Sequence, residues 1–524
     1  MPASVRGAAT VEELVRSCGG GGGDCARLIR RIPAKTTRNI PQHAILEDLM
    51  ETSIPPRQTA RSCGIVESPI SSGFKAETIF RQGTQMLEHN DATTGNSRRN
   101  FLASSVALGA AGIVAPYAFG ALGRAAIQSK NGFINIALIG CGGRGSGAAN
   151  DTLTGNPGVR LVAMADINTE AAKSARDELK KKFEDRVSIA DTDIYGGLDG
   201  YLKVLARADV DLVILATSPG FRPHHIAAAV AAKKHVFAEK PVCVDTAGYH
   251  MCCAAHDAAL AQGTAIATGT QYRRQESFVD AIAKIREGMI GDVVGMTARY
   301  CSNGIWYRDR KPGMSDLEYQ IYNWMHFIWL SGDQISEQAV HNVDCIHWVM
   351  GGPPIRAFAS GSRWKRPADS EMWDSFSVDY EWADGRICSL QCRHWEGAST
   401  DFANVVYGSK GTATIRAFSE GSVIRDRAGK ELWRTKGDIG AAYVAEHKAL
   451  VASIAENKPV VELRQTAEAS LMAVMGREAA YSGTVATWEF MTTESKLDLF
   501  PKNMDLQGSA PTPFIRRPGE YQLS

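Results

Sequence analysis

Three closely spaced glycines could bring a phosphate group against the backbone. Gly140, Gly142 and Gly145 fit G-x-G-x-x-G directly after the apolar run FINIALIG. The first glycine permits a tight turn, the second lets the backbone approach a pyrophosphate, and the third allows close helix–strand packing. The N-terminus of the following helix would stabilise the phosphate charge, and Arg144 in the same loop is a further candidate contact with the cofactor. The alternative is a glycine turn that binds no ligand.

An acidic residue stands at a distance from this loop that suits ribose recognition. Asp166 ends a second apolar run, VRLVAMAD, and lies 21 residues after Gly145. Its carboxylate could accept hydrogen bonds from the ribose hydroxyls of NAD, whereas it would repel the 2′-phosphate of NADP. No arginine follows Asp166 immediately. The sequence therefore predicts NAD as the cofactor and disfavours NADP.

A lysine could supply acid/base chemistry at the end of another apolar run. In HVFAEKPVCVD, Glu239, Lys240 and Pro241 follow the predicted strand at its carboxyl end, where ligands bind in open α/β sheets. A lysine that is desolvated beside a nicotinamide can have a lowered pKa and act as an acid or a base. A solvated surface lysine is the alternative. The preceding acid and the following proline favour a site, and Glu239 and Lys240 are candidates to contact the cofactor.

A third group of candidate residues lies on a predicted helix. Within GDQISEQAVHNVDCIHW, Glu337, His341, Asp344 and Trp348 stand at i, i+4, i+7 and i+11, so their side chains share one face. A glutamate and a histidine one turn apart could bind a metal, but no third ligand is evident, and we predict no metal site. An acid/base or substrate-binding face is the favoured interpretation. His347 is expected to make a structural contact.

The elements that must position these residues follow from the hydrophobic pattern. From about Phe133 the chain alternates short apolar runs with amphipathic stretches, which is typical of a parallel sheet covered by helices on both faces. After about Asp292, strand-like segments joined by hairpin-type turns such as Asp384-Gly385 replace this alternation. Five parallel strands are predicted, in FINIALIG, VRLVAMAD, VDLVILAT, KHVFAEKP and GTAIATGT. Helices are predicted near 334–350, 441–456 and 464–482.

The predicted fold is an α/β Rossmann dinucleotide-binding domain followed by an α+β domain with a large, mostly antiparallel open sheet. We assign residues 131–270 to the first domain and 271–490 to the second, which would bind substrate and form oligomer contacts. Residues 491–524 form a C-terminal tail. Residues 1–96 lack sustained hydrophobic periodicity and are expected to be disordered. Alternatively, the true start lies near Met86, and residues 1–85 are a mis-annotated extension.

Residues 97–123 have the features of an export signal. Arg98 and Arg99 precede Phe101 in the pattern S-R-R-x-F-L, and no charged residue occurs from Asn100 to Gly123. This order of features is typical of a twin-arginine signal, although a buried alanine-rich helix is the alternative. We expect the twin-arginine export machinery as a partner and a periplasmic or envelope-associated location.

Composition narrows the class of partner. The net charge is +1 and there is no stripe of lysine and arginine, so we expect no nucleic-acid partner. The 11 cysteines include no C-x-x-C spacing of a structural zinc site. We expect them to pack in the core as small apolar groups.

The motifs above resemble the glucose–fructose oxidoreductase, inositol dehydrogenase and rhizopine-catabolism (Gfo/Idh/MocA) family over roughly residues 130–490. Glu239-Lys240-Pro241 and the segment ATSPGFRPHH, Ala216 to His225, carry the likeness besides the glycine loop. The resemblance implies that Lys240 sits between nicotinamide and substrate, often in a cis peptide bond before Pro241. It also implies that Thr217 and Pro219 lie against the cofactor.

The same resemblance bears on the predicted helix of the second domain, which in the family presents an Asp and a His four residues apart to the substrate. His341 matches the His, while Glu337 stands where Asp is common. Glu337 would either orient His341 or bind a substrate hydroxyl. Dimers and tetramers built on the open sheet are common in the family, so a homodimer or homotetramer is expected.

A stretch predicted to be an extended loop or insertion facing the cleft has residue types suited to sugars. In YCSNGIWYRDRKPGMSDLEYQIYNWMHF, Asn303 could read hydroxyl groups and Trp306 could stack on C–H surfaces. Arg273, in GTQYRR, is predicted to face the same cleft, with Tyr272 as a weaker candidate. Structural packing is an equal alternative for each residue. Further candidates of these types are Tyr307, Arg308, Trp324 and His326.

These features predict an exported NAD(H)-dependent oxidoreductase that acts on a sugar, polyol or glycoside and keeps its cofactor tightly bound. Lys240 would take a proton from a ring hydroxyl as hydride moves from that carbon to the nicotinamide, and His341 would assist. One alternative is a redox-neutral enzyme that oxidises a glycoside transiently, cleaves it by elimination and reduces the product with the same cofactor. A second is a non-catalytic sugar-binding protein on this scaffold.

Overall fold

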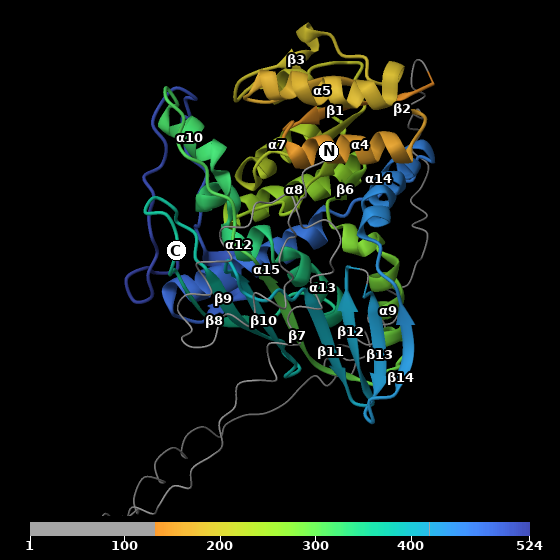
Figure 1. Ribbon diagram of the computed structural model, residues 1–524, viewed down its shortest axis with the longest axis vertical. Coiled ribbons are helices and arrows are strands. Elements are labelled where there is room, and N and C mark those ends of the chain that lie inside the picture. Colours follow the sequence, from red (N-terminus) through yellow and green to blue (C-terminus); the bar gives the residue numbers. More distant parts are fainter. Residues whose placement is uncertain (1–131, 419) are drawn as a thin grey trace, which may run out of the picture. The chain divides into compact units, whose positions relative to one another are not determined.

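The computed structural model describes residues 132–418 and 420–524 (Figure 1). The predicted extension 1–96 and the predicted signal 97–123, with Arg98 and Arg99, lie outside the described residues. Both stay predictions. Among the described residues, no helix is long and apolar enough to cross a membrane.

The first sheet has six parallel strands in the order β3-β2-β1-β4-β5-β6, which is a Rossmann arrangement. All five predicted strands are present, and their side chains are largely buried, as continuous apolar runs require. β3 has two residues and no apolar run, so the pattern could not reveal it. The strands are β1 (Ile134–Ile139), β2 (Val159–Ala165), β3 (Ile194–Tyr195), β4 (Leu212–Leu215), β5 (His235–Ala238) and β6 (Ile266–Thr268).

Helices connect these strands and cover the sheet (Figure 1). The amphipathic stretch EAAKSARDELKKKF forms α5, which Asn168 caps by accepting a hydrogen bond from the backbone N–H of Ala171. The helices are α4 (Gly143–Gly155), α5 (Thr169–Phe183), α6 (Gly200–Leu205), α7 (Arg222–Ala231) and α8 (Thr246–Gln262).

The second sheet has nine strands in the order β14-β13-β12-β11-β7-β10-β9-β8-β15. Only the β7–β10 pairing is parallel, so the sheet is mixed and mostly antiparallel, as predicted. The strands are β7 (Val293–Ser302), β8 (Arg356–Ser362), β9 (Ser375–Glu381), β10 (Ile387–His394), β11 (Ala403–Gly408), β12 (Gly411–Arg416), β13 (Ser422–Asp426), β14 (Glu431–Thr435) and β15 (Ala486–Thr487).

Helices cover one face of this second sheet, and burial alternates along its strands. In β9, Phe376, Val378 and Tyr380 are buried while Ser377 and Asp379 point to the open face. The helices of this part are α9 (Glu276–Arg286), α10 (Asp316–Tyr322), α11 (Ile328–Ser331), α12 (Asp333–Glu337), α13 (Val340–Met350), α14 (Ile439–Ala455) and α15 (Leu463–Ser482).

α14 comes late in the sequence but packs against the Rossmann sheet, beside α4 (Figure 1). The residues after it pair with the outer edge of β6, where the N–H of Ile266 donates to Val460 and its carbonyl accepts from Glu462. The last strand of the first sheet is thus covered by chain that follows it by about two hundred residues.

The remaining features concern the tail and the cysteines. The tail lies along the second domain, where Gln320 donates to Pro511 and Tyr521 donates to Glu478. All eight described cysteines are free thiols, and seven of them are buried, in agreement with core packing. No group of three His, Cys, Asp or Glu side chains suited to a metal occurs in residues 132–418 and 420–524.

Candidate active site

The glycine loop combines close packing with an open cradle. Gly140 has φ +91°, and a Cβ there would lie 2.6 Å from backbone atoms of Ala216 and Thr217. A Cβ on Gly145 would lie 1.9 Å from the carbonyl oxygen of Gly140, so the start of α4 packs directly on the loop. A Cβ on Gly142 would meet nothing within 4 Å. The open position lies at the N-terminus of a 13-residue helix, whose free N–H groups favour an anion.

Asp166 lies beside this cradle. One carboxylate oxygen accepts the backbone N–H of Cys141 at 2.7 Å, and the other accepts that of Asn168 at 2.8 Å. Burial raises the pKa of the Asp166 carboxyl above its usual range. No lysine or arginine pairs with it among the described residues. The open Gly142 backbone and this carboxylate fit the pyrophosphate and a ribose of NAD, respectively.

The loop after β4 borders the glycine loop. Thr217 lies against Gly140, and its hydroxyl shares a hydrogen bond of 3.2 Å with Nδ1 of His225. Pro219 is buried and begins a short 3-10 helix that leads into α7. A Cβ on Gly220 would lie 2.0 Å from the carbonyl oxygen of Trp329, so this loop also packs tightly against α11. Thr217 is therefore placed next to the predicted cofactor loop, whereas the predicted contact of Pro219 with the cofactor stays a prediction.

Arg144 and Glu239 are held together. The Arg144 Nε donates to the buried Glu239 carboxylate, and the guanidinium also lies 3.6 Å from Asp151 and 3.5 Å from Glu446. Arg144 thus contacts three carboxylates at the edge of the cradle. Its predicted contact with a cofactor stays a prediction.

Lys240 lies at the carboxyl end of β5, in a cis peptide bond with Pro241. Its Nζ donates to the Glu337 carboxylate at 2.8 Å and to the Glu337 carbonyl oxygen at 2.5 Å. Both side chains are largely buried, with exposed fractions of 12% and 9%. The structure therefore brings Lys240 and Glu337 together across the two domains.

The helix predicted over 334–350 is interrupted at this contact, and the prediction of one continuous helical face was wrong. α12 ends at Glu337 and α13 begins at Val340. In a continuous α-helix the Glu337 carbonyl would accept the N–H of His341. That N–H is instead directed to Gln338 at 3.5 Å, and the released carbonyl accepts Lys240.

His341 follows this break and lies near Lys240. Burial, together with the positive charges of Lys240 and Arg144, lowers the pKa of His341 well below the usual histidine range. Its ring lies 5.1 Å from that of Tyr272, and part of its surface remains open. Neither ring nitrogen has a hydrogen-bond partner among the described residues. At neutral pH the imidazole is thus uncharged and free to accept a proton.

Two residues that the sequence did not indicate extend the Lys240–Glu337 contact. The Gln338 amide donates to Glu337 at 2.5 Å, and the Tyr300 hydroxyl donates to Gln338 at 2.6 Å. Burial is the main reason why the pKa of Tyr300 is raised. Tyr300 lies on β7, outside every motif that the sequence offers. Gln338 lies in the interruption between α12 and α13, which the sequence did not predict.

α14 brings further unpredicted residues to the glycine loop. The Tyr443 ring lies 4.5 Å from the Arg144 guanidinium, and the Gln271 amide donates to the Tyr443 hydroxyl at 3.2 Å. Glu446 is 1% exposed, and burial and then Glu239 raise the pKa of its carboxyl well above the usual range. No local signal could have connected residues that lie about 300 positions from Arg144.

Arg273 is not free to meet a substrate in this structure. Its guanidinium binds both carboxylate oxygens of Asp344 at 2.8–3.0 Å and lies 5.2 Å from the Trp348 ring. The Asp344 and Trp348 part of the predicted functional face is thus used for packing. His347 makes the expected structural contact, 2.9 Å from Glu468.

Asn303 and Trp306 lie beyond the end of β7. Asn303 is exposed, and Trp306 packs in an aromatic cluster, 6.1 Å from Trp324 and 5.9 Å from His326. The Arg308 guanidinium lies 4.1 Å from the Trp306 ring. Neither Asn303 nor Trp306 contacts Lys240, Glu337 or His341 directly, so their substrate role stays a prediction.

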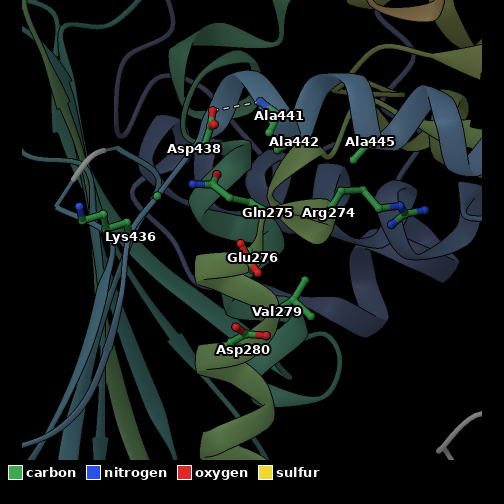
Figure 2. A pocket seen from close by; sticks show the side chains of 11 residues that line it. Arg274, Gln275, Glu276, Val279, Asp280, Lys436, Asp438, Ala441, Ala442 and Ala445 are labelled. Atoms are coloured by element: carbon green, nitrogen blue, oxygen red, sulfur yellow. Dashed lines mark hydrogen bonds between the residues drawn. The ribbon is translucent and has the colours of Figure 1, made fainter. Parts of the chain in front are cut away.

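A separate cavity of about 470 Å³ lies between α9 and the start of α14 (Figure 2). The alanines of α14 line it, whereas Tyr443 and Glu446 of the same helix contact Arg144. Asp438 caps α14 at its rim by accepting the N–H of Ala441. This cavity is therefore distinct from the candidate active site. It is lined by Arg274, Gln275, Glu276, Val279, Asp280, Lys436, Gly437, Asp438, Ala441, Ala442 and Ala445.

The Rossmann sheet, its glycine cradle and the lysine after β5 define a two-domain NAD-dependent oxidoreductase. Residues 134–266 match the Gfo/Idh/MocA oxidoreductase family, NAD-binding Rossmann fold, and residues 278–414 match the Gfo/Idh/MocA C-terminal domain. The chain belongs to the Gfo/Idh/MocA oxidoreductase family. This confirms the predicted family, the NAD-binding domain and the assignment as an enzyme.

Two similar curated proteins differ in what their names describe. Inositol 2-dehydrogenase of Acidothermus cellulolyticus is 24% identical over 333 residues, which cover 62% of this chain and 86% of that protein. A glycosyl hydrolase family 109 protein of Streptomyces coelicolor is 34% identical over 113 residues, which cover 21% of this chain and 23% of that protein.

Two solved structures share the fold. Levoglucosan dehydrogenase in complex with NADH and levoglucosan gives a TM-score of 0.54 at 18% identity and covers 68% of this chain and 99% of its own. Scyllo-inositol dehydrogenase from Lactobacillus casei, with bound NAD(H) and scyllo-inositol, gives a TM-score of 0.53 at 18% identity with the same coverage.

The glycine loop yields a paired test. Gly142→Ala should leave the melting temperature of the nucleotide-free protein unchanged, because the added Cβ meets open space, and should weaken NAD binding by about tenfold or more by intruding on the cradle. Gly145→Ala should lower the melting temperature, because its Cβ collides with the backbone of Gly140. NAD titration and thermal unfolding measure both effects. Gly158→Ala, another open glycine, is the control, and an unchanged NAD affinity in Gly142→Ala would contradict the assigned cradle.

Proposed function

We propose that this chain oxidises a sugar, polyol or glycoside by NAD(H)-dependent hydride transfer at a ring carbon that carries a hydroxyl. The observation that carries this proposal is the contact between Lys240 and Glu337, with His341 close enough to feel the charges of Lys240 and of Arg144 in the glycine loop. The names of its relatives and fold neighbours support the substrate class, since inositols and levoglucosan are polyhydroxylated rings.

Different residues would bind the cofactor and the substrate. Gly142 and Asp166 would hold NAD, which supplies the hydride acceptor when it is bound. Lys240 directs two of its three ammonium protons to Glu337, which leaves one N–H for a substrate oxygen.

His341 is the better placed proton acceptor in this arrangement. Its neutral imidazole has no competing hydrogen bond, whereas Lys240 is already bound to a carboxylate. We therefore assign proton acceptance to His341 and orientation of the reacting hydroxyl to Lys240, the reverse of the division expected from sequence. The hydroxyl proton passes to an imidazole nitrogen as the ring carbon loses its hydride.

The pH profile tests this division. A proton acceptor must be unprotonated, and the lowered pKa keeps His341 unprotonated below the usual value of about 6.5. The plot of kcat/KM for oxidation against pH should therefore stay level through pH 6.5 and fall only at lower pH. In Lys240→Met the fall should move to higher pH, because one of the charges that lower the His341 pKa is lost. A wild-type fall centred at or above pH 6.5 would count against His341 as the acceptor.

The proposed reaction is tested by NADH absorbance with NAD and a panel of myo-inositol, scyllo-inositol, levoglucosan, glucose and an aryl glucoside. At least one compound should give net NADH, and Lys240→Met should reduce kcat by about 10²-fold, because the reacting hydroxyl is no longer oriented. The control is Lys284→Met, which removes a partly exposed lysine paired with Glu287.

The same panel separates the alternatives. The likeness to a glycosyl hydrolase family 109 protein favours redox-neutral glycoside cleavage as the second candidate function. Release of the aryl alcohol without added NAD, and with no net NADH, would support it. Binding of these compounds with no turnover would instead support a non-catalytic role and would contradict the proposed oxidation.

We propose further that the protein is exported by the twin-arginine route with NAD tightly bound and acts as a homodimer or homotetramer. The S-R-R-x-F-L pattern supports export, and exposed Phe358, Ile387 and Tyr407 on the open sheet support contact between subunits. Native mass spectrometry of the protein from the cell envelope should show an N-terminus near the end of the signal segment 97–123, retained nucleotide and two or four subunits. A cytoplasmic, nucleotide-free monomer would contradict all three statements.

A further inference from the structure

A buried arginine connects the two loops that flank the candidate site. Arg222 begins α7 and is 2% exposed. Its Nη1 donates to the carbonyl oxygen of Pro241 at 2.6 Å, and its Nη2 donates to the carbonyl oxygen of Thr217. One guanidinium thus joins the turn that carries Lys240 to the loop beside the glycine cradle.

The two carbonyls need this donor because of where they lie. Thr217 and Pro241 follow β4 and β5, neighbouring strands whose ladder ends at Leu215 and Ala238. Beyond that point the strands no longer supply N–H partners, and a buried carbonyl without one costs about 1–3 kcal/mol. The planar guanidinium can satisfy both carbonyls at once, which the single ammonium group of a lysine cannot do with the same geometry.

The charge of Arg222 is unusual for its position. Among the described residues no carboxylate lies within ion-pair distance of it, although burying an unpaired cation is costly. Burial lowers the pKa of Arg222 to about 10, and the negative charges of Glu239 and Glu337 oppose that shift. Arg222 therefore lies in the field of two carboxylates that bind Arg144 and Lys240, respectively. A retained buried cation in this setting indicates a role beyond packing.

We propose that Arg222 is a positioning residue for Lys240, and that its guanidinium fixes the Lys240–Pro241 turn at a set distance from the Thr217 loop. The inference rests on the proposed function in that Lys240 is taken to meet the substrate. Arg222 itself touches neither substrate nor the reacting atoms.

Substitution of Arg222 should disturb Lys240 more than it disturbs the fold. Arg222→Ala should lower kcat by about 10- to 100-fold, the range expected when a catalytic group is displaced by about 1 Å. Guanidinium chloride, added well below unfolding concentrations, should restore part of that loss by occupying the vacated space, whereas equal sodium chloride should not. Arg222→Lys should keep the charge and most of the volume but stay impaired, because the single nitrogen of an ammonium cannot reproduce the fixed geometry in which Nη1 and Nη2 each bind one carbonyl.

A second readout does not depend on turnover. Acetic anhydride acetylates unprotonated lysines, and peptide mass spectrometry gives the rate for Lys240 relative to Lys284, which is partly exposed. Lys240 should react slowly in the wild type, where Glu337 binds it, and severalfold faster in both Arg222 variants. If no sugar is oxidised by the wild type, the proposed function fails, yet this rate still tests Arg222.

The matched control is Arg186→Ala. Arg186 also donates to two carbonyls, those of Leu153 and Asn156 at 2.8 and 3.1 Å, at the far end of α4 from the glycine loop. It should change neither kcat nor Lys240 acetylation. If Arg222→Ala does not fold, Arg222→Lys supplies the same readouts. An Arg222 variant with wild-type kcat and wild-type Lys240 acetylation, or one whose kcat loss guanidinium leaves unchanged while acetylation stays normal, would overturn the proposal.

Discussion

The contact between Lys240 and Glu337 is the interaction on which the candidate site depends. It joins the carboxyl end of β5 to the break between α12 and α13, and so fixes the two domains relative to one another at the reacting centre. It also explains why the helix is broken there, because Lys240 takes a carbonyl that the helix would otherwise use. The buried ammonium group of Lys240 needs partners, and the break after Glu337 supplies a backbone carbonyl as one of them.

The sequence predicted what is encoded locally. Gly140, Gly145 and Asp166 lie within one strand–helix–strand unit, so their spacing sufficed to place them, and the buried apolar runs sufficed for five strands. The interruption after Glu337 was missed because its cause, Lys240, lies 97 residues earlier. Arg273 was predicted to face the cleft because the sequence does not show that it pairs with Asp344, 71 residues later. Hydrophobic periodicity predicts which face of a helix or strand a residue occupies, but it does not predict which residues from distant parts of the chain contact that face.

The charged side chains around the Lys240–Glu337 contact alternate in sign, and this alternation stabilises their arrangement. Arg144, Glu239, Arg222, Glu337 and Lys240 alternate in sign from the glycine loop to the reacting centre. In surroundings of low polarity such an arrangement resists change, because moving one member weakens the stabilisation of its neighbours. The fold places all five at the carboxyl edge of the first sheet or facing it. The same surroundings keep His341 uncharged.

The late return of the chain to the Rossmann sheet has a consequence for biosynthesis. Val460 and Glu462 complete the edge of β6, and Tyr443 and Glu446 complete the surroundings of Arg144. A nascent chain that has just emerged through β6 therefore exposes an unpaired strand edge and an incomplete nucleotide loop. The edge of β6 and the surroundings of Arg144 are completed only after residue 462 has been synthesised. These contacts have a large sequence separation, and such contacts form slowly.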